Sequence, residues 1–220
     1  KETNAAMELQ AVLDNQRAAF RAEGPGAIAT RIDRLDRCIA LLVDNQQAIC
    51  EAVNKDFGCR SKFPTLMMDI MNSVGSLKFV KKNLKKWMKP EKRSPFMPMN
   101  FLGAKAYIKY QPKGVVGIMT PWNVPVNMIF SPLADVLGAG NRAIIKPSEF
   151  TPYSGLAWGV LAEMAGIPAG VVNVITGDSS AIGKELCSNE IVRNWLISTE
   201  FCTLGAKIPS EIVQKGWLKN

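Results

Sequence analysis

Asn123 lies between two prolines in the segment TPWNVP (residues 120–125), directly after the apolar run Val115–Met119. Prolines restrict the backbone, so this turn is stiff. A rigidly held asparagine amide can donate a hydrogen bond to an oxyanion that develops during a reaction. The same residue can instead cap the helix that follows. Its spacing leaves both roles open.

A lysine and a glutamate follow the next apolar run, Ala143–Lys146, in the segment KPSE (residues 146–149). Pro147 ends the strand, which lets Lys146 and Glu149 project into a crevice. A carboxylate there can accept hydrogen bonds from both hydroxyls of a ribose, and it repels a 2′-phosphate, which favours NAD over NADP. The alternative is a surface ion pair that needs no ligand.

A third polar turn, GDSSAIG (residues 177–183), follows the run Val171–Ile175. Gly177 permits a sharp turn, and the amides after it open a helix N-terminus, which attracts phosphate. The segment is neither a GxGxxG fingerprint nor a P-loop. A plain strand-to-helix turn is therefore the alternative interpretation.

The elements that would position these turns alternate regularly. The apolar runs Val115–Met119, Ala143–Lys146, Val171–Ile175 and Trp195–Ser198 start 28, 28 and 24 residues apart, with helical patterns near 127–139, 152–165 and 179–188 between them. This alternation predicts an α/β fold with a Rossmann-like parallel sheet and flanking helices. Ligands of such sheets bind beyond the carboxyl ends of the strands, where all three turns lie.

The first half of the chain has a different pattern. Its first 90 residues are predicted to be mostly helical, with a long helix from about Pro64 that stops before Pro90. A proline-punctuated linker (90–103) and an alternating strand (Ala104–Tyr110) follow. We expect an N-terminal helical part (1–103), a strand segment (104–113), a Rossmann-like part (114–208) and an atypical tail (209–220).

Composition excludes several classes of protein. The 220 residues are 47% hydrophobic and 21% charged, and no stretch approaches the roughly 20 apolar residues of a membrane-spanning helix. There is no histidine, which excludes Ser-His and Cys-His catalysis and His-ligated metals within this chain. The five cysteines form no CxxC pair, and the first 25 residues contain no apolar signal core. We expect a cytoplasmic protein with no metal site.

The net charge of +8 is concentrated in residues 78–93, which hold eight of the 27 Lys and Arg residues. Its lysines recur at helical spacing, so they are expected to form one solvated helix face. The opposite, core-facing stripe of this helix is expected to consist of Leu77, Val80, Leu84 and Trp87. No nucleic-acid-binding motif accompanies the charge, so nucleic acid is not an expected partner. Polyanion binding through this face is the weaker alternative.

The polar turns, taken together, resemble a known family. YQPKGVVGIMTPWNVPV (110–126), LADVLGAGNRAIIKPSEFTP (133–152) and VVNVITG (171–177) are similar in order and spacing to NAD(P)-dependent aldehyde dehydrogenases. RIDRLDRCIALLVDN (31–45), DFGCRS (56–61) and KWMKPEKR (86–93) look like the coniferyl aldehyde dehydrogenase branch. The similarity covers the N-terminal half of that family's chain.

The resemblance implies a role for each matching residue. Asn123 would steady the oxyanion of a thiohemiacetal. The residues that would contact the NAD cofactor are Thr120, Trp122, Lys146, Ser148, Glu149, Gly177, Ser179, Ser180 and Gly183. The strand Ala104–Tyr110 resembles the arm that family members use for subunit pairing, which implies a homodimer.

The sequence also departs from the family pattern. The segment after Trp195–Ser198 carries Glu200 and Phe201 where family members have glycine and serine, and an acid there opposes pyrophosphate binding. No segment resembles those that carry the cysteine nucleophile and glutamate base of the family, so we expect no catalytic domain and no turnover by this chain alone. The resemblance implies oxidation of an aromatic aldehyde. A non-catalytic nucleotide-binding or oligomerisation remnant is the alternative.

Overall fold

A four-stranded parallel sheet forms the centre of the fold. The computed structural model describes residues 2–99, 101–164, 166–168, 170–176 and 195–197. The strands lie in the order β5-β4-β3-β6, with β3 at Val115–Met119, β4 at Arg142–Lys146, β5 at Val172–Val174 and β6 at Trp195–Ile197. All three neighbouring pairs are parallel. The predicted Rossmann-like parallel sheet is therefore confirmed, strand by strand.

Two crossover helices connect the strands, as the spacing predicts. Helix α6 (Asn127–Gly138) joins β3 to β4, and α7 (Pro152–Met164) joins β4 to β5. The helix predicted near 179–188 lies outside the described residues.

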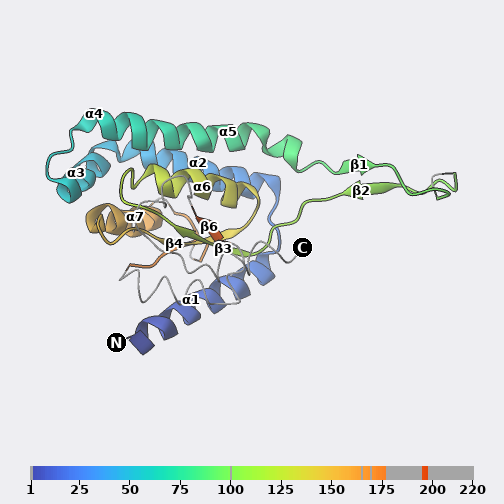
Figure 1. Cartoon of the computed structure of the whole chain (residues 1–220), viewed down its shortest axis with the longest axis horizontal. Helices are drawn as coiled ribbons and strands as arrows, with labels where there is room; N and C mark the ends of the chain where they lie inside the picture. The colour runs from blue at the N-terminus through green and yellow to red at the C-terminus, as the bar shows by residue number, and fades with distance from the viewer. Residues whose placement is uncertain (1, 100, 165, 169, 177–194, 198–220) are drawn as a thin grey trace, which may run out of the picture.

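Helices of the N-terminal half form the outer layer (Figure 1). They are α1 (Glu2–Glu23), α2 (Ile28–Asp44), α3 (Gln46–Phe57), α4 (Lys62–Pro64), the π-helical segment η1 (Thr65–Met71) and α5 (Asn72–Trp87). The predicted long helix from Pro64 is present as η1 and α5. On α5, Leu77, Val80 and Leu84 are buried as expected, whereas Trp87 is 44% exposed and meets the ring of Phe79 edge-on. The prediction that Trp87 faces the core is therefore wrong: Trp87 is the last residue of α5 and lies at the surface.

Both faces of the sheet are covered, which explains the solid apolar runs of the strands. Successive side chains of a strand point to opposite faces. Val116 and Ile118 belong to the main core with residues of α2, α5 and α6, whereas Val115 and Ile144 pack against Leu9 and Leu13 of α1. Figure 1 shows α1 on the side of the sheet opposite α6 and α5.

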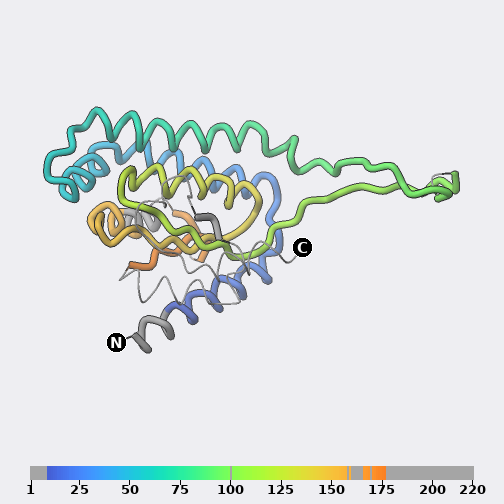
Figure 2. Tube along the Cα trace, viewed as in Figure 1, coloured from blue at the N-terminus to red at the C-terminus, as the bar shows by residue number. Residues whose placement is uncertain are grey.

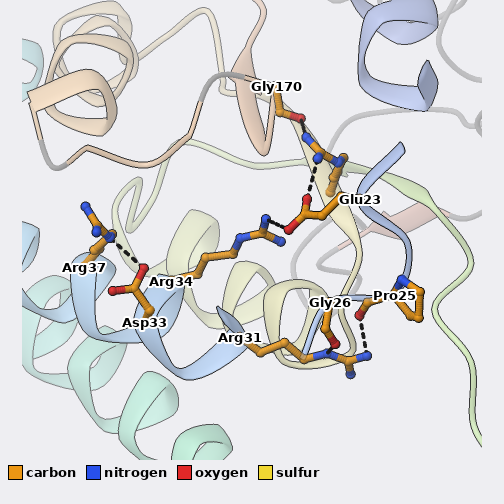
Figure 3. A network of polar contacts seen from close by, with 9 residues as sticks. Glu23, Pro25, Gly26, Arg31, Asp33, Arg34, Arg37 and Gly170 are labelled. Carbon is orange, nitrogen blue, oxygen red and sulfur yellow. Dashed lines mark hydrogen bonds and ion pairs between the residues drawn. The ribbon is translucent and has the colours of Figure 1, made fainter. Parts of the chain in front are cut away.

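A buried ionic cluster ties α1 to the rest of the fold (Figure 3). The carboxylate of Glu23, at the end of α1, accepts hydrogen bonds from Arg34 of α2 at 2.5 Å and from Arg142 of β4 at 2.6 Å. Arg31 donates to the Pro25 carbonyl at 2.7 Å, which holds the turn between α1 and α2. The side chains of Arg34 and Arg142 are each 6% exposed, so Glu23 neutralises charges that water does not reach freely.

A long hairpin projects from the body (Figure 2). Strand β1 (Glu91–Arg93) pairs antiparallel with β2 (Ala106–Ile108). The predicted strand at 104–110 is thus present but shorter. Residues 91–93 form a strand and not the linker that the prolines predict. Their pairing partners are residues 106–108, which local composition does not reveal.

Candidate functional site

Two of the predicted polar turns lie side by side at the carboxyl edge of the sheet. Met119 and Lys146, the last residues of β3 and β4, are direct partners in the parallel register. The Thr120 N–H continues the ladder by donating to the Lys146 carbonyl at 3.2 Å. The TPWNVP and KPSE turns therefore leave adjacent strands at the same edge.

The strand order marks this edge as the binding crevice of the sheet. From β3 the chain moves to β4 and β5 on one side, whereas β6 pairs with β3 on the other side. The order therefore reverses at β3, and such a switch point is where open α/β sheets bind their ligands. Residues 120–125 follow β3 directly, so they lie at this point.

Asn123 does not cap the helix after it. Helix α6 begins at Asn127, and its first amides are bound by Asp69, whose Oδ1 accepts from the Val126 N–H at 3.0 Å and the Asn127 N–H at 3.2 Å. The Asn123 Oδ1 is buried without a hydrogen-bond partner among the described residues. The capping alternative is thus wrong, because a carboxylate from a distant segment takes that place.

A second unsatisfied oxygen lies in the same turn. The Thr120 Oγ1 is also buried without a partner in the part of the chain that the structure describes. Buried polar atoms are normally hydrogen-bonded. Two unpaired oxygens within four residues of sequence fit a site that is completed by a further group.

Trp122 presents an aromatic surface beside this turn. Its side chain is 51% exposed, and its ring centroid lies 6.2 Å from that of Phe57 on α3. The ring is thereby supported on one side by another aromatic group.

Lys146 and Glu149 form an ion pair, but not a surface one. The Lys146 Nζ donates to Glu149 Oε2 at 3.0 Å and to the Pro147 carbonyl at 3.1 Å. The Lys146 side chain is 3% exposed and that of Glu149 is 37% exposed. The ammonium is therefore buried under the edge of the sheet, while the carboxylate faces solvent. The surface-pair alternative is wrong for the lysine.

Ser148 is buried within the KPSE turn, where its Oγ accepts a hydrogen bond from the Phe150 N–H at 3.2 Å. This contact shapes the turn, and a cofactor contact for Ser148 stays a prediction. Gly177, Ser179, Ser180 and Gly183 lie outside the described residues, as do Glu200 and Phe201.

Two aspartates that the sequence did not single out hold the crossover helices. Asp69 binds the start of α6, and Asp56 of α3 accepts from the backbone N–H groups of Tyr153 at 2.9 Å and Ser154 at 2.7 Å at the start of α7. A phosphate at either helix end would meet a carboxylate. These two helix N-termini are therefore closed to pyrophosphate.

Arg60 links this support to the site. Its guanidinium donates to the Asn123 carbonyl at 2.7 Å and to Asp69 Oδ2 at 3.0 Å. A charged residue inside the apolar helical stretch TLMMDIM (65–71) is a signal for a buried Asp69, whereas nothing local to Arg60 predicts its partner. Arg60 also borders a cavity of about 260 Å³ whose lining includes Cys50 and Cys59.

Over the described ranges, no helix is long and apolar enough to cross a membrane. In the same part of the chain, no group of three or more His, Cys, Asp or Glu side chains is arranged to hold a metal ion.

Comparison with known proteins yields relatives of one kind. The chain is 53% identical over 143 residues to a probable coniferyl aldehyde dehydrogenase of Caulobacter vibrioides, a match covering 64% of this chain and 29% of the relative. It is 45% identical over 159 residues to the coniferyl aldehyde dehydrogenase of a Pseudomonas species, covering 72% and 32%. The chain thus spans about a third of the length of these relatives.

Solved structures match the fold. A crystal structure described as an E. coli NADP-dependent enzyme superposes with a TM-score of 0.77 at 29% identity, over 87% of this chain and 38% of that one. An indole-3-acetaldehyde dehydrogenase of P. syringae, solved in complex with NAD+, superposes with a TM-score of 0.77 at 27% identity over the same shares. The sequence model of the aldehyde dehydrogenase family matches residues 2–198, and the chain belongs to the aldehyde dehydrogenase family.

Proposed function

We propose that this chain supplies the cofactor cleft and the oxyanion donor for NAD-dependent oxidation of an aromatic aldehyde to its carboxylic acid. The single observation that carries the proposal is the hydrogen bond from the Thr120 N–H to the Lys146 carbonyl, which sets the two polar turns side by side. The similarity to coniferyl aldehyde dehydrogenases supports the aromatic substrate class.

The residues present fit NAD. Glu149 offers an exposed carboxylate that can accept from both hydroxyls of a ribose, and the buried Lys146 ammonium fixes it from behind. Thr120 and Trp122 would line the cleft next to this corner. NAD supplies a hydride acceptor when bound. The Glu149 charge opposes a 2′-phosphate, so NADP is the poorer ligand.

Asn123 would act on the substrate. Attack of a thiolate on the aldehyde carbon moves charge onto the carbonyl oxygen, and an amide donor held in place stabilises that charge. The thiol and the base of this chemistry belong to segments that the sequence of these 220 residues does not contain. We therefore expect the chain to bind the cofactor but to form no reduced nicotinamide from an aldehyde by itself.

Calorimetric titration of NAD into the 220-residue chain tests the proposal. We expect micromolar binding, weakened about tenfold in Glu149→Ala, because a charge-assisted hydrogen bond to the ribose is lost. Glu51→Ala on α3 removes another exposed acid and is the matched control. A folded chain that takes up no NAD, or steady reduction of NAD in the presence of an aromatic aldehyde, would contradict the respective parts of the proposal.

We further propose that the β1–β2 hairpin pairs subunits into a homodimer. Its exposed aromatic and aliphatic side chains favour this role: Phe96 is 87% exposed, Phe101 79% and Leu102 76%. Apolar surface concentrated on a projecting arm is typical of a contact between proteins.

A further inference from the structure

We propose that Arg60 and Asp69 are positioning residues that hold the Asn123 turn in the geometry of an oxyanion donor. The inference rests on the proposed function for the purpose of the turn. The clamp itself is a matter of geometry and can be tested without any ligand.

The two side chains grip the turn from both ends. The Arg60 guanidinium donates a hydrogen bond to the backbone carbonyl of Asn123 at 2.7 Å. Asp69 Oδ1 accepts hydrogen bonds from the backbone N–H groups of Val126 at 3.0 Å and Asn127 at 3.2 Å. The ion pair between Arg60 and Asp69 Oδ2, at 3.0 Å, links these two sets of hydrogen bonds. The backbone between residues 123 and 127 is thereby fixed at its first carbonyl and its last amides.

Burial makes this arrangement demanding. The Asp69 side chain is fully buried and that of Arg60 is 13% exposed. A buried charge is costly unless it is paired and hydrogen-bonded. Burial raises the pKa of Asp69, while the hydrogen bond from Asn127, the charge of Arg60 and the hydrogen bond from Val126 oppose that rise. Both oxygens of Asp69 accept hydrogen bonds: Oδ1 binds the first amides of α6, and Oδ2 binds Arg60.

Arg60 also supports Trp122, the exposed residue of the turn. Its guanidinium carbon lies 4.7 Å from the centroid of the Phe57 ring, which in turn contacts the Trp122 ring at 6.2 Å. One guanidinium therefore reaches Asn123 directly and Trp122 through a single aromatic ring. A shift of Arg60 is expected to be felt at both residues.

The backbone that carries Asp69 is unusual. Asp69 belongs to η1, a π-helical segment of seven residues between α4 and α5. Such segments are rare and recur at functional sites. The Asp69 carbonyl accepts hydrogen bonds from the Asn72 N–H and, at 2.5 Å, from the Ser73 Oγ. The segment thus places a buried carboxylate where a regular helix would place another residue.

Preorganisation is what an oxyanion donor needs. A donor that must reorganise during the reaction loses most of its effect, and a displacement of about 1 Å can cost about 10²-fold in rate. Clamping by Arg60 and Asp69 restricts the turn before any substrate arrives. They act through Asn123, so they are positioning and not catalytic residues.

Two substitutions release Arg60 from its contacts and leave an acceptor for the α6 amides in place. Asp69→Asn keeps an oxygen for the α6 amides but turns an N–H donor toward Arg60, so it releases Arg60 alone. Arg60→Lys keeps the positive charge beside Asp69 but lacks the planar fork needed to reach the Asn123 carbonyl as well. Asp56→Asn is the matched control, because the two amides that Asp56 binds, those of Tyr153 and Ser154, belong to α7 and not to the turn.

The readout is the nitrogen–proton spectrum of the 220-residue chain. The side-chain amide of Asn123 is assigned by its loss in Asn123→Asp, and the Trp122 indole by its loss in Trp122→Phe. We expect both signals to move by more than their line widths in Asp69→Asn and in Arg60→Lys, and to stay in place in Asp56→Asn. Signals that coincide with those of the unaltered chain in both site variants would overturn the proposal.

A folding defect is recognised separately. If Asp69→Asn loses its dispersed spectrum, Arg60→Lys, which retains the carboxylate on α6, decides the outcome. The NAD titration of the unaltered chain distinguishes the two proposals. If the unaltered chain does not bind NAD but the Asn123 and Trp122 signals shift in the variants, the proposed function is wrong and the positioning role stands. If the chain binds NAD but the signals do not shift, the positioning role is wrong.

Discussion

The ion pair of Lys146 and Glu149 shows how one side chain can set a preference between cofactors. The lysine is buried and the glutamate is half-buried, so the positive charge orients the carboxylate without covering it. The exposed part of Glu149 presents its carboxylate charge to solvent. That charge accepts hydroxyl hydrogen bonds and repels a phosphate at the same place.

Replacing Glu149 by glutamine tests this preference. Glu149→Gln keeps the shape and one acceptor oxygen but removes the charge. The ratio of NADP affinity to NAD affinity should rise about tenfold, because repulsion of the 2′-phosphate is lost. Titration with both cofactors measures the ratio, with Glu51→Gln as the control. An unchanged ratio would show that Glu149 does not face the ribose.

At the scale of elements, the attachment of α1 depends on a charge cluster as well as on apolar contacts. Leu9 and Leu13 pack on one face of the sheet, and Glu23 joins Arg34 and Arg142 at the end of the helix. The hydrogen bond from Arg34, and then the charges of Arg34 and Arg142, lower the pKa of Glu23 against the opposing effect of burial. Ionised Glu23 is therefore favoured by the folded state.

This cluster makes stability depend on pH in a defined direction. Because the folded pKa of Glu23 lies below its ordinary value of 4.5, its contribution is complete above 4.5 and is lost as the pH falls through the folded value. Glu23→Gln should lower the free energy of unfolding by about 2 kcal/mol at neutral pH, since two buried arginines lose their partner.

Urea unfolding at several pH values measures this effect. The difference between Glu23→Gln and the unaltered chain should shrink as the pH falls below 4.5. Asp36→Asn breaks an ion pair with Lys81 in which both side chains are at least 40% exposed, and it should change stability much less. A difference that stays constant across this pH range would argue against the cluster as its source.

At the scale of the whole molecule, the fold separates a covered body from an exposed arm. The hairpin projects beyond α5 (Figure 1). Its apolar side chains Phe96, Phe101 and Leu102 are exposed to solvent. The body buries its apolar residues on both faces of the sheet. An isolated two-stranded hairpin is only marginally stable, so contact with another subunit would stabilise the arm more than its own two short strands do.

The arm gives a prediction about assembly. Phe101→Ser together with Leu102→Ser should shift the chain toward the monomer, because both side chains are more than three-quarters exposed and contribute little to the body. Light scattering coupled to size-exclusion chromatography measures the mass. Phe63→Ser removes a ring that is 70% exposed on α4 and serves as the control. Equal masses for all variants over a range of concentrations would contradict the arm's role.

Some of the site was predictable because its geometry follows from general rules of sheets. The runs 115–119 and 143–146 are short, apolar and separated by a helical pattern, which favours neighbouring parallel strands with their ends at one edge, and the two strands do pair in this way. That alone brings Asn123 and Glu149 to the same side. The helix-cap interpretation of Asn123 could not be decided this way, since its competitor Asp69 lies 54 residues earlier.

The sequence by itself determined the parallel sheet, the two crossover helices and the place of the polar turns, because hydrophobic periodicity and strand spacing are local properties. Only the tertiary structure decided what holds those turns. Arg60 and Asn123, which are in contact, lie 63 residues apart in sequence. The pairing of β1 with β2 joins the two ends of the segment that forms the arm. Such contacts depend on how separate elements pack, since a buried charge finds its partner in space and leaves no periodic trace along the chain.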